Sequence, residues 1–204
     1  DVLLREHVVD MIIAGKGGHI GGDMSVMEIL VELYMKQMNI SPENKDLDNR
    51  DRFVLSKGHS VESYYAVLAK KGFFPMEEVI STFSQFGSKF IGHPNNKLPG
   101  IEMNSGSLGH GLPVCVGMAM AGKMDRKDYR VYVVMGDGEL AEGSVWEGAM
   151  AASHYCLDNL CAVVDRNRLQ ISGCTEDVMG HDDLHERFRS FGWHVIDVAD
   201  GNDI

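Results

Sequence analysis

The sequence predicts an α/β fold in which a parallel sheet is covered by helices on both faces. Apolar segments such as RVYVVM (130–135) and LCAVVD (160–165) alternate with helical patterns along the 204 residues. These two segments are apolar throughout, as expected for strands whose two faces are both buried. No internal repeat or low-complexity linker interrupts this order. We therefore expect residues 1–204 to form a single domain.

Spacing and boundary signals predict each element in turn. Apolar side chains recur at helical spacing over residues 3–14, and the glycine-rich stretch 15–22 ends this pattern. The S-x-x-E sequence at 25–28 matches a capping box and would open a second helix, and Pro75 suits the first turn of another. Residues 112–124 are small and apolar on most sides, which predicts a buried helix. The expected helices are 3–14, 25–38, 61–70, 75–83, 112–124, 142–155 and 184–191, and the expected strands are 53–56, 130–135, 160–165 and 194–198.

Composition and charge argue against some classes of binding partner. The formal net charge of −11 argues against nucleic acid or an anionic membrane as a partner, because phosphates repel such a surface. No segment approaches the roughly 20 apolar residues of a membrane helix, and the charged start is not a signal peptide. The cysteines, none of which forms a C-x-x-C pair, predict reduced core thiols in a cytoplasmic protein. They are Cys115, Cys156, Cys161 and Cys174.

The segment GDGELAEG (136–143) carries the strongest chemical signal. It directly follows the expected strand 130–135 and precedes a helix, and open α/β sheets bind ligands at this end of a strand. Gly136 and Gly138 would let the backbone approach a ligand, and Asp137 offers a carboxylate. The next strand ends near Asn167. If the two strands are neighbours, Asp137 and Asn167 reach one point above the sheet.

Such oxygen ligands suit Mg²⁺ or Ca²⁺ and not zinc. Because Mg²⁺ usually has few protein ligands and completes its shell with phosphates and water, this arrangement predicts a diphosphate ligand. The N-terminus of the following helix would add N–H donors and a favourable dipole. The segment GKGG (15–18) lacks the P-loop pattern, so we reject a nucleotide-binding loop there.

GDG followed by an Asn about thirty residues later resembles the thiamine-diphosphate enzymes. Four further segments resemble those of transketolases in the family's order: GGHIGGDMS (17–25), LSKGHS (55–60), GHP (92–94) and SGSLGHG (105–111). The resemblance covers nearly the whole chain. It implies the fold of a diphosphate-binding (PP-type) domain, with thiamine diphosphate and Mg²⁺ or Ca²⁺ as cofactors. The metal ligands would be Asp137, Asn167 and the carbonyl of Leu169.

The same resemblance implies roles for three histidines. His19, His59 and His93 each follow a glycine in a loop and would face the thiazolium and the sugar, with His59 also in contact with the cofactor. Near neutral pH, histidine donates to oxygens or transfers protons. The other histidines are expected to be structural, and His110, which stands where the family has Gln, is an intermediate case.

Further cofactor contacts are implied around the two glycine-rich loops. Gly106 and Leu108 would line the aminopyrimidine and the diphosphate, and Gly136 and Gly138 would approach the diphosphate, Gly138 through its N–H. Glu142 would join a carboxylate network between two cofactor sites and act in catalysis. Its structural alternative is a helix N-terminal acid that complements the helix dipole.

Three charged residues keep open assignments. Lys57 is as readily a solvated charge as a ligand, and Asp165 either orients Asn167 or simply ends its strand. Arg166, beside the metal loop, is expected to point outward. The usual Pro after the first histidine of the family is Ile20 here, a departure that would alter the rigidity of the turn.

The resemblance implies that catalysis needs a second chain. The pyrimidine-binding domain, with the glutamate that activates the cofactor, has no counterpart in 1–204, and the domain itself is expected to continue past Ile204. We therefore expect the N-terminal subunit of a split transketolase that moves a two-carbon ketol unit from a ketose phosphate to an aldose. The halves would assemble as a heterotetramer or a self-associating dimer. The alternatives are a non-catalytic cofactor-binding module and a deoxyxylulose-phosphate synthase-like or 2-oxoacid dehydrogenase-like subunit.

Overall fold

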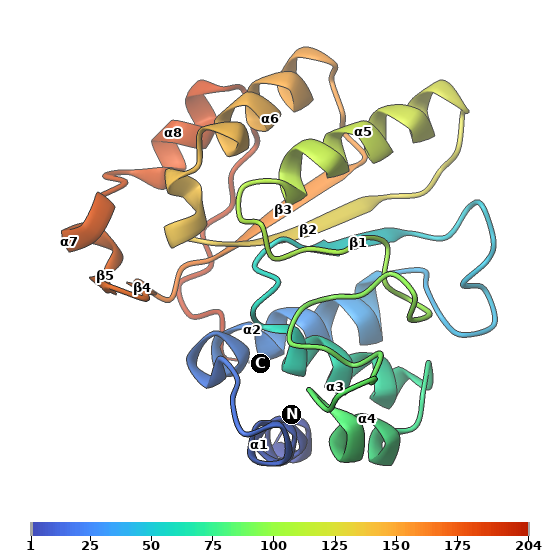
Figure 1. The fold of residues 1–204 in the computed structure, drawn as a ribbon. Coiled ribbons are helices and arrows are strands. Elements are labelled where there is room, and N and C mark those ends of the chain that lie inside the picture. The colour runs from blue at the N-terminus through green and yellow to red at the C-terminus, as the bar shows by residue number, and fades with distance from the viewer. Residues whose placement is uncertain (1, 204) are drawn as a thin grey trace.

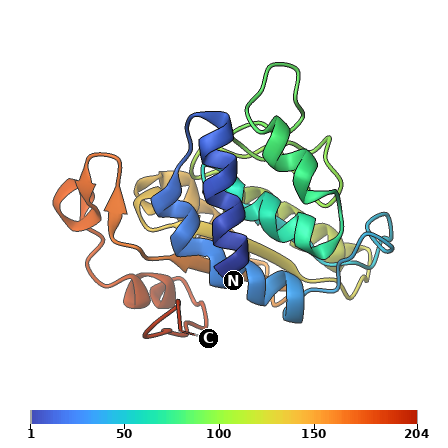
Figure 2. The same cartoon turned by 90° about the horizontal axis from the view of Figure 1, so that it is seen from below.

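The computed structural model describes residues 2–203 and arranges them in three layers (Figure 1). Within these residues, three parallel strands in the order β1-β2-β3 form the central sheet. Helices α1 to α4 cover one face of this sheet, and α5, α6 and α8 cover the other. Seen from below, α1 lies across α2 and α3 as the outermost helix of its layer (Figure 2). The predicted α/β architecture is confirmed.

Among the described residues, two α-helices precede β1, three lie between β1 and β2, one lies between β2 and β3, and two follow β5. The strands are β1 (Arg52–Leu55), β2 (Val131–Gly136), β3 (Leu160–Asp165), β4 (Leu169–Gln170) and β5 (Gly173–Cys174). The helices are α1 (Val2–Gly15), α2 (Ile20–Glu32), α3 (Val61–Lys71), α4 (Met76–Thr82), α5 (Gly111–Met124), α6 (Gly143–His154), α7 (Thr175–Met179) and α8 (Leu184–Ser190). A π-helical turn, η1 (Leu33–Gln37), extends α2, and a 3₁₀ turn, η2 (Gly138–Ala141), follows β2.

The central strand β2 separates two hydrophobic cores by simple alternation. Successive side chains of a strand point to opposite faces of the sheet. Tyr132 and Val134 join the core formed with α1 to α4, whereas Val131, Val133 and Met135 join the core formed with α5, α6 and α8. Because both faces are buried, the whole strand is apolar, and its carboxyl end opens into a loop where polar groups can gather.

The predicted start of the second helix was wrong. Helix α2 begins at Ile20 rather than at Ser25, and the Ser25 hydroxyl donates to Asp165 Oδ1 at 2.5 Å across the molecule instead of capping a helix. Two glycines in the first turn cost roughly 1 kcal/mol each. Burial of Val26, Met27 and Leu30 against the sheet outweighs that cost.

Three other expectations also differ from the structure. Residues 194–198 form no strand, because no described strand pairs with them and Ile196 remains 74% exposed. Helix α5 is buried on one side only, with Val114 exposed. Of the cysteines, only Cys115 is a core thiol, and the other three are exposed. The antiparallel pair β4-β5 and helix α7 were not foreseen. Within residues 2–203, no helix has the length and apolar character needed to cross a membrane.

Candidate active site at the carboxyl edge of the sheet

Asp137 lies at the point where β2 ends beside β3. Gly136 pairs with Asp165 in the parallel register, and the N–H of Asp137 donates to the Asp165 carbonyl at 3.2 Å. The Asp137 side chain is only 2% exposed. Its Oδ1 accepts a hydrogen bond from the N–H of Gly138 at 3.0 Å. The carboxylate is therefore held by the turn that begins directly after the strand.

The loop after β3 approaches the same carboxylate. Asp137 Oδ2 accepts from the N–H of Arg168 at 2.9 Å and from the Thr175 hydroxyl at 3.1 Å. Arg168 directly follows Asn167, whose own Oδ1 accepts from the N–H of Leu169 at 3.0 Å. Asp137 therefore contacts the residue that directly follows Asn167. The two predicted residues lie near each other at the ends of neighbouring strands, as the spacing predicted. Thr175 was not foreseen, because a lone threonine after a loop carries no recognisable signal.

The oxygen atoms at this edge fit a hard divalent cation. A carboxylate offers about four acceptor positions, and three donors occupy those of Asp137, so one remains for a cation. An amide oxygen and a backbone carbonyl nearby are ligands that Mg²⁺ or Ca²⁺ accepts. Among the described residues, no group of three His, Cys, Asp or Glu side chains is arranged for a metal. The donor set therefore suits Mg²⁺ with a phosphate ligand better than it suits zinc.

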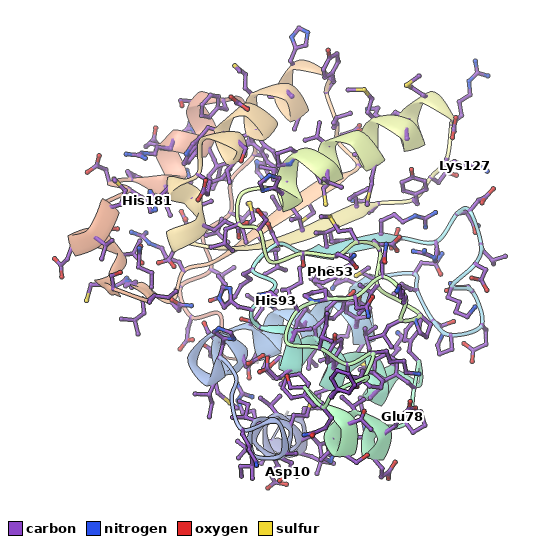
Figure 3. The ribbon with its side chains drawn as sticks, viewed as in Figure 1. Asp10, Phe53, Glu78, His93, Lys127 and His181 are labelled. Carbon is purple, nitrogen blue, oxygen red and sulfur yellow. The ribbon has the colours of Figure 1, made fainter. Side chains whose placement is uncertain are left out.

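Three histidines from separate loops converge. The ring centroid of His19 lies 5.4 Å from that of His59 and 6.3 Å from that of His93, in edge-to-face arrangements. His19 precedes α2, His59 lies between β1 and α3, and His93 lies between α4 and α5. Figure 3 shows His93 between the two helical layers, whereas Lys127 lies at the far edge where β2 begins. The predicted trio therefore forms one cluster.

The histidines differ in their surroundings. His59 is partly buried, whereas His19 and His93 are exposed. Burial lowers the pKa of His59 to about 4, and the nearby positive charge of Lys57 and the other two histidines add to this effect. Burial and His19 also lower the pKa of His93. At neutral pH, His59 is therefore uncharged, with one ring nitrogen to donate a hydrogen bond and one to accept.

Glycines allow the loop 105–109 to lie against the histidine cluster. Gly106 has φ +132°, and a Cβ there would collide with the ring of His93. A Cβ at Gly58 would lie 2.8 Å from the N of Gly106, and the Ser105 hydroxyl donates to the Leu55 carbonyl at 2.6 Å. The motifs LSKGHS and SGSLGHG are thus in direct backbone contact.

The other predicted contact residues surround this loop. Leu108 is partly buried, and its carbonyl lies 3.1 Å from Nδ1 of the exposed His110. Glu142 is exposed at the N-terminus of α6, without a capping hydrogen bond from its side chain, and lies beside Gly109. Gly138 packs against Gln170, whose Oε1 is buried without a hydrogen-bond partner.

Sequence reasoning missed Glu139, a buried carboxylate that joins three segments. Its Oε1 accepts from the N–H of Gly109 at 2.8 Å and from the Ser56 hydroxyl, and its Oε2 accepts from the N–H of Gly136 at 3.1 Å. Burial raises the pKa of Glu139, and these donors partly offset the effect. The only sequence signal was an acid directly after GDG, which is more often solvated.

The alternative of a solvated charge at Lys57 is wrong. Its side chain is 1% exposed and forms an ion pair with Asp165, and its Nζ also donates to the Gly22 carbonyl at 3.2 Å. Asp165 therefore does more than end its strand. Arg166 is exposed and lies 3.3 Å from Glu176, pointing outward as expected.

Comparison with known proteins identifies the family. The profile described as "Transketolase, thiamine diphosphate binding domain" matches residues 2–204. The chain belongs to the transketolase family. It is 52% identical, over 95% of its length and 69% of the relative, to an apulose-4-phosphate transketolase subunit of Phocaeicola vulgatus. It is 40% identical to human transketolase over 98% of its own length but 32% of the human protein.

Solved transketolase structures have the same fold. A mutant transketolase from Pichia stipitis matches with a TM-score of 0.90 and 35% identity, covering 97% of this chain and 31% of that one. The enzyme from Leishmania mexicana matches with a TM-score of 0.88 and 32% identity over 98% of this chain and 31% of that one. The chain therefore spans about a third of the length of these solved chains. The family, the fold and the transketolase character predicted from the sequence are confirmed.

The role of Glu139 in holding three segments together can be tested by shortening its side chain. Glu139→Ala would leave the N–H groups of Gly109 and Gly136 buried without an acceptor, at about 1–3 kcal/mol each. We expect a lower free energy of unfolding, measured with urea. Glu147→Ala, an exposed position on α6, is the control and should change stability by no more than about 0.5 kcal/mol. Equal stability of the two variants would contradict the assigned role.

The low pKa of His59 predicts a pH dependence of stability. Its folded pKa of about 4 lies below the usual 6.5, so unfolding takes up a proton between these values. The stability contributed by neutral His59 is present above pH 6.5 and is lost as pH falls toward 4. His59→Gln should therefore lose less stability than the unsubstituted protein over this range, measured by urea unfolding at pH 4.5, 5.5 and 7. Parallel losses would show that His59 is not the group responsible.

Proposed function

We propose that this chain is the diphosphate-binding half of a thiamine-diphosphate-dependent transketolase that moves a two-carbon ketol unit from a ketose phosphate to an aldose. One observation carries the proposal. The ring centroid of His19 lies 5.4 Å from that of His59 and 6.3 Å from that of His93. In the same chain, neighbouring strand ends bring Asp137 to the loop that carries Asn167. A transketolase needs both parts, one to hold the cofactor and the other to act on sugar oxygens.

The metal and the diphosphate would be held at the carboxyl edge of the sheet. Asp137, Asn167 and the carbonyl of Leu169 are the proposed ligands of Mg²⁺ or Ca²⁺, and their oxygens are of the type that such ions prefer. Gly136 and Gly138 would leave room for the diphosphate, and Gly106 and Leu108 would line the cofactor. Thiamine diphosphate, when bound, supplies the electron sink for breaking and forming the carbon–carbon bond.

The histidines would act on the sugar. Because His59 is uncharged at neutral pH, it can donate to one oxygen while accepting from another group. His19 and His93, which are exposed, would orient hydroxyl groups and move protons between substrate oxygens. These roles depend on the loops that the contacts of Gly58 and Gly106 hold together.

A second chain would complete the site. His19, His93 and Glu142 are exposed, so this surface alone does not exclude water from the reacting groups, as an active site requires. The relative from Phocaeicola vulgatus is named as one subunit of its transketolase, which supports a partner chain carrying the pyrimidine-binding domain. Glu142 would then face that partner in a heterotetramer or self-associating dimer. The four free cysteines support a reducing, cytoplasmic compartment.

The substrate that donates the carbon unit distinguishes this function from those of other thiamine-diphosphate enzymes. The full-length protein with its partner chain, thiamine diphosphate and Mg²⁺ should release an aldose from a ketose phosphate. The panel should include xylulose 5-phosphate and apulose 4-phosphate, because relatives of this chain carry the latter name. Turnover of pyruvate instead would indicate a synthase or dehydrogenase, and no turnover of any donor would indicate a non-catalytic module.

The metal assignment has its own test. Asp137→Ala should abolish the Mg²⁺-dependent part of thiamine diphosphate binding, measured by calorimetry with and without the metal, because it removes the only charged ligand proposed. Asp128→Ala, an exposed acid in the loop before β2 at the opposite end of the sheet, is the control. Unchanged affinity in Asp137→Ala would remove the proposed metal site.

A further inference from the structure

Two acidic side chains are buried behind the histidine cluster, between α2 and α3. Asp23 is 0% exposed and Glu62 is 1% exposed. No salt bridge to either acid occurs within residues 2–203. Burying one unpaired carboxylate is costly, and burying two that face each other is more so. A pair of this kind in a folded protein calls for a physical explanation.

Hydrogen bonds satisfy the pair only in part. Asp23 Oδ1 accepts from the N–H of Ser63 at 2.8 Å, and the Ser63 hydroxyl donates to the Asp23 carbonyl at 2.9 Å. Asp23 Oδ2 and Glu62 Oε2 are both buried without another protein partner. Each acid acts on the pKa of the other through a side-chain hydrogen bond. One proton between the two carboxyl groups would supply the donor for this hydrogen bond. It would also reduce the buried charge of the pair from two negative charges to one.

The pair is in direct contact with the turn that carries His19. A Cβ at Gly18 would collide with Glu62 Oε1, so the carboxyl group of Glu62 lies under the backbone of the residue before His19. Burial raises the pKa of Glu62, and the charge and backbone N–H of His19 are among the contacts that oppose this rise. A side chain at this position would displace the Glu62 carboxyl group and would also meet Ile12 Cγ1.

The two acids are not equivalent. Burial, and then the charge of Glu62, raise the pKa of Asp23 to about 8. Burial also raises the pKa of Glu62, but the N–H and charge of His19 and the hydrogen bond from Asp23 oppose this. Burial and the charge between the two acids therefore favour one proton on the pair, and the contacts with His19 favour the negative charge on Glu62. The ionisable neighbours of the pair are His19, in the loop before α2, and Tyr65, on α3, whose pKa is raised by burial and then by the charge of Glu62.

We propose that Asp23 and Glu62 share one proton and act as positioning residues for His19, with the charged Glu62 holding the Gly18–His19 turn so that its imidazole lies beside His59 and His93. This rests on the proposed function of His19 in the transketolase reaction. Within residues 2–203, neither acid forms a hydrogen bond to a histidine ring. Their effect is transmitted through the turn and through the charge that faces His19.

The first test separates substrate positioning from cofactor binding. In the full-length protein with its partner, Glu62→Gln keeps the size of the side chain but removes the charge. We expect kcat/KM for the ketose phosphate to fall about tenfold or more, as for supporting residues in other sites, with thiamine diphosphate affinity unchanged. Asp23→Asn mimics the protonated acid and should lose clearly less. Equal losses in the two variants, or lost cofactor affinity in Glu62→Gln, would overturn the proposal.

Adjacent glycines provide a matched pair of variants. Gly18→Ala places a Cβ against Glu62 Oε1 and against Ile12 Cγ1, so it displaces Glu62 from the turn and should reproduce the kinetic defect of Glu62→Gln. Gly17→Ala places its Cβ where no atom lies within 4 Å and should have no comparable effect. Thermal unfolding and circular dichroism show whether each variant is folded. A folded Gly18→Ala protein with unchanged kcat/KM would contradict the positioning role.

The shared proton has a readout that does not depend on activity. The folded pKa of Asp23, about 8, lies above its ordinary value of 3.8, so the folded protein holds a proton that the unfolded chain releases between these values. Stability from this proton is fully present below pH 3.8 and is lost as pH rises toward 8. From pH 5 to 7.5, the unfolding equilibrium constant of the unsubstituted protein should rise, relative to Asp23→Asn, by up to about tenfold per pH unit. Parallel pH profiles would overturn proton sharing, whether or not any ketose phosphate is turned over.

If proton sharing holds but no ketose phosphate is a substrate, the proposed function fails, and with it the positioning role.

Discussion

The buried ion pair between Lys57 and Asp165 is the interaction on which the arrangement of the site depends. Lys57 follows β1 and Asp165 ends β3, and the same two side chains also bind the Gly22 carbonyl and the Ser25 hydroxyl of α2. Removing one member of such a pair leaves a buried charge, at about 3–5 kcal/mol. The pair therefore holds the histidine-bearing segments before α2 and after β1 against the loop that carries Asn167.

Around this pair, buried acids organise the loops, while several side chains proposed to act in the reaction stay exposed. Glu139 binds the backbone of the loop at Gly109 and the end of β2, and Asp137 binds the backbone of the loop after β3. His19, His93 and Glu142, in contrast, are exposed. Rigid support beneath an open surface suits a site that is completed by another protein surface, because the supporting groups are in place before the partner binds.

Much of the fold and part of the site could be predicted from local sequence. The apolar strands around β2 and β3 and the helices between them follow from periodicity. The convergence of Asp137 and Asn167 follows from placing both at the carboxyl ends of neighbouring parallel strands. Local signals failed where long-range packing opposed them: Ser25 looked like a helix cap but bonds to Asp165, and 194–198 looked like a strand but has no described partner.

By itself, the sequence determined the layered α/β class, the meeting of Asp137 with the Asn167 loop at the carboxyl edge of the sheet and the three glycine–histidine loops, because these depend on periodicity and on short motifs. Only the tertiary structure decided which charges are buried. Lys57 pairs with a residue 108 positions away, and Glu139 binds one 83 positions away, while Asp23 and Glu62 face each other between two helices. Whether a charged side chain is solvated, paired or protonated depends on the surfaces packed against it. Those surfaces come from distant parts of the chain.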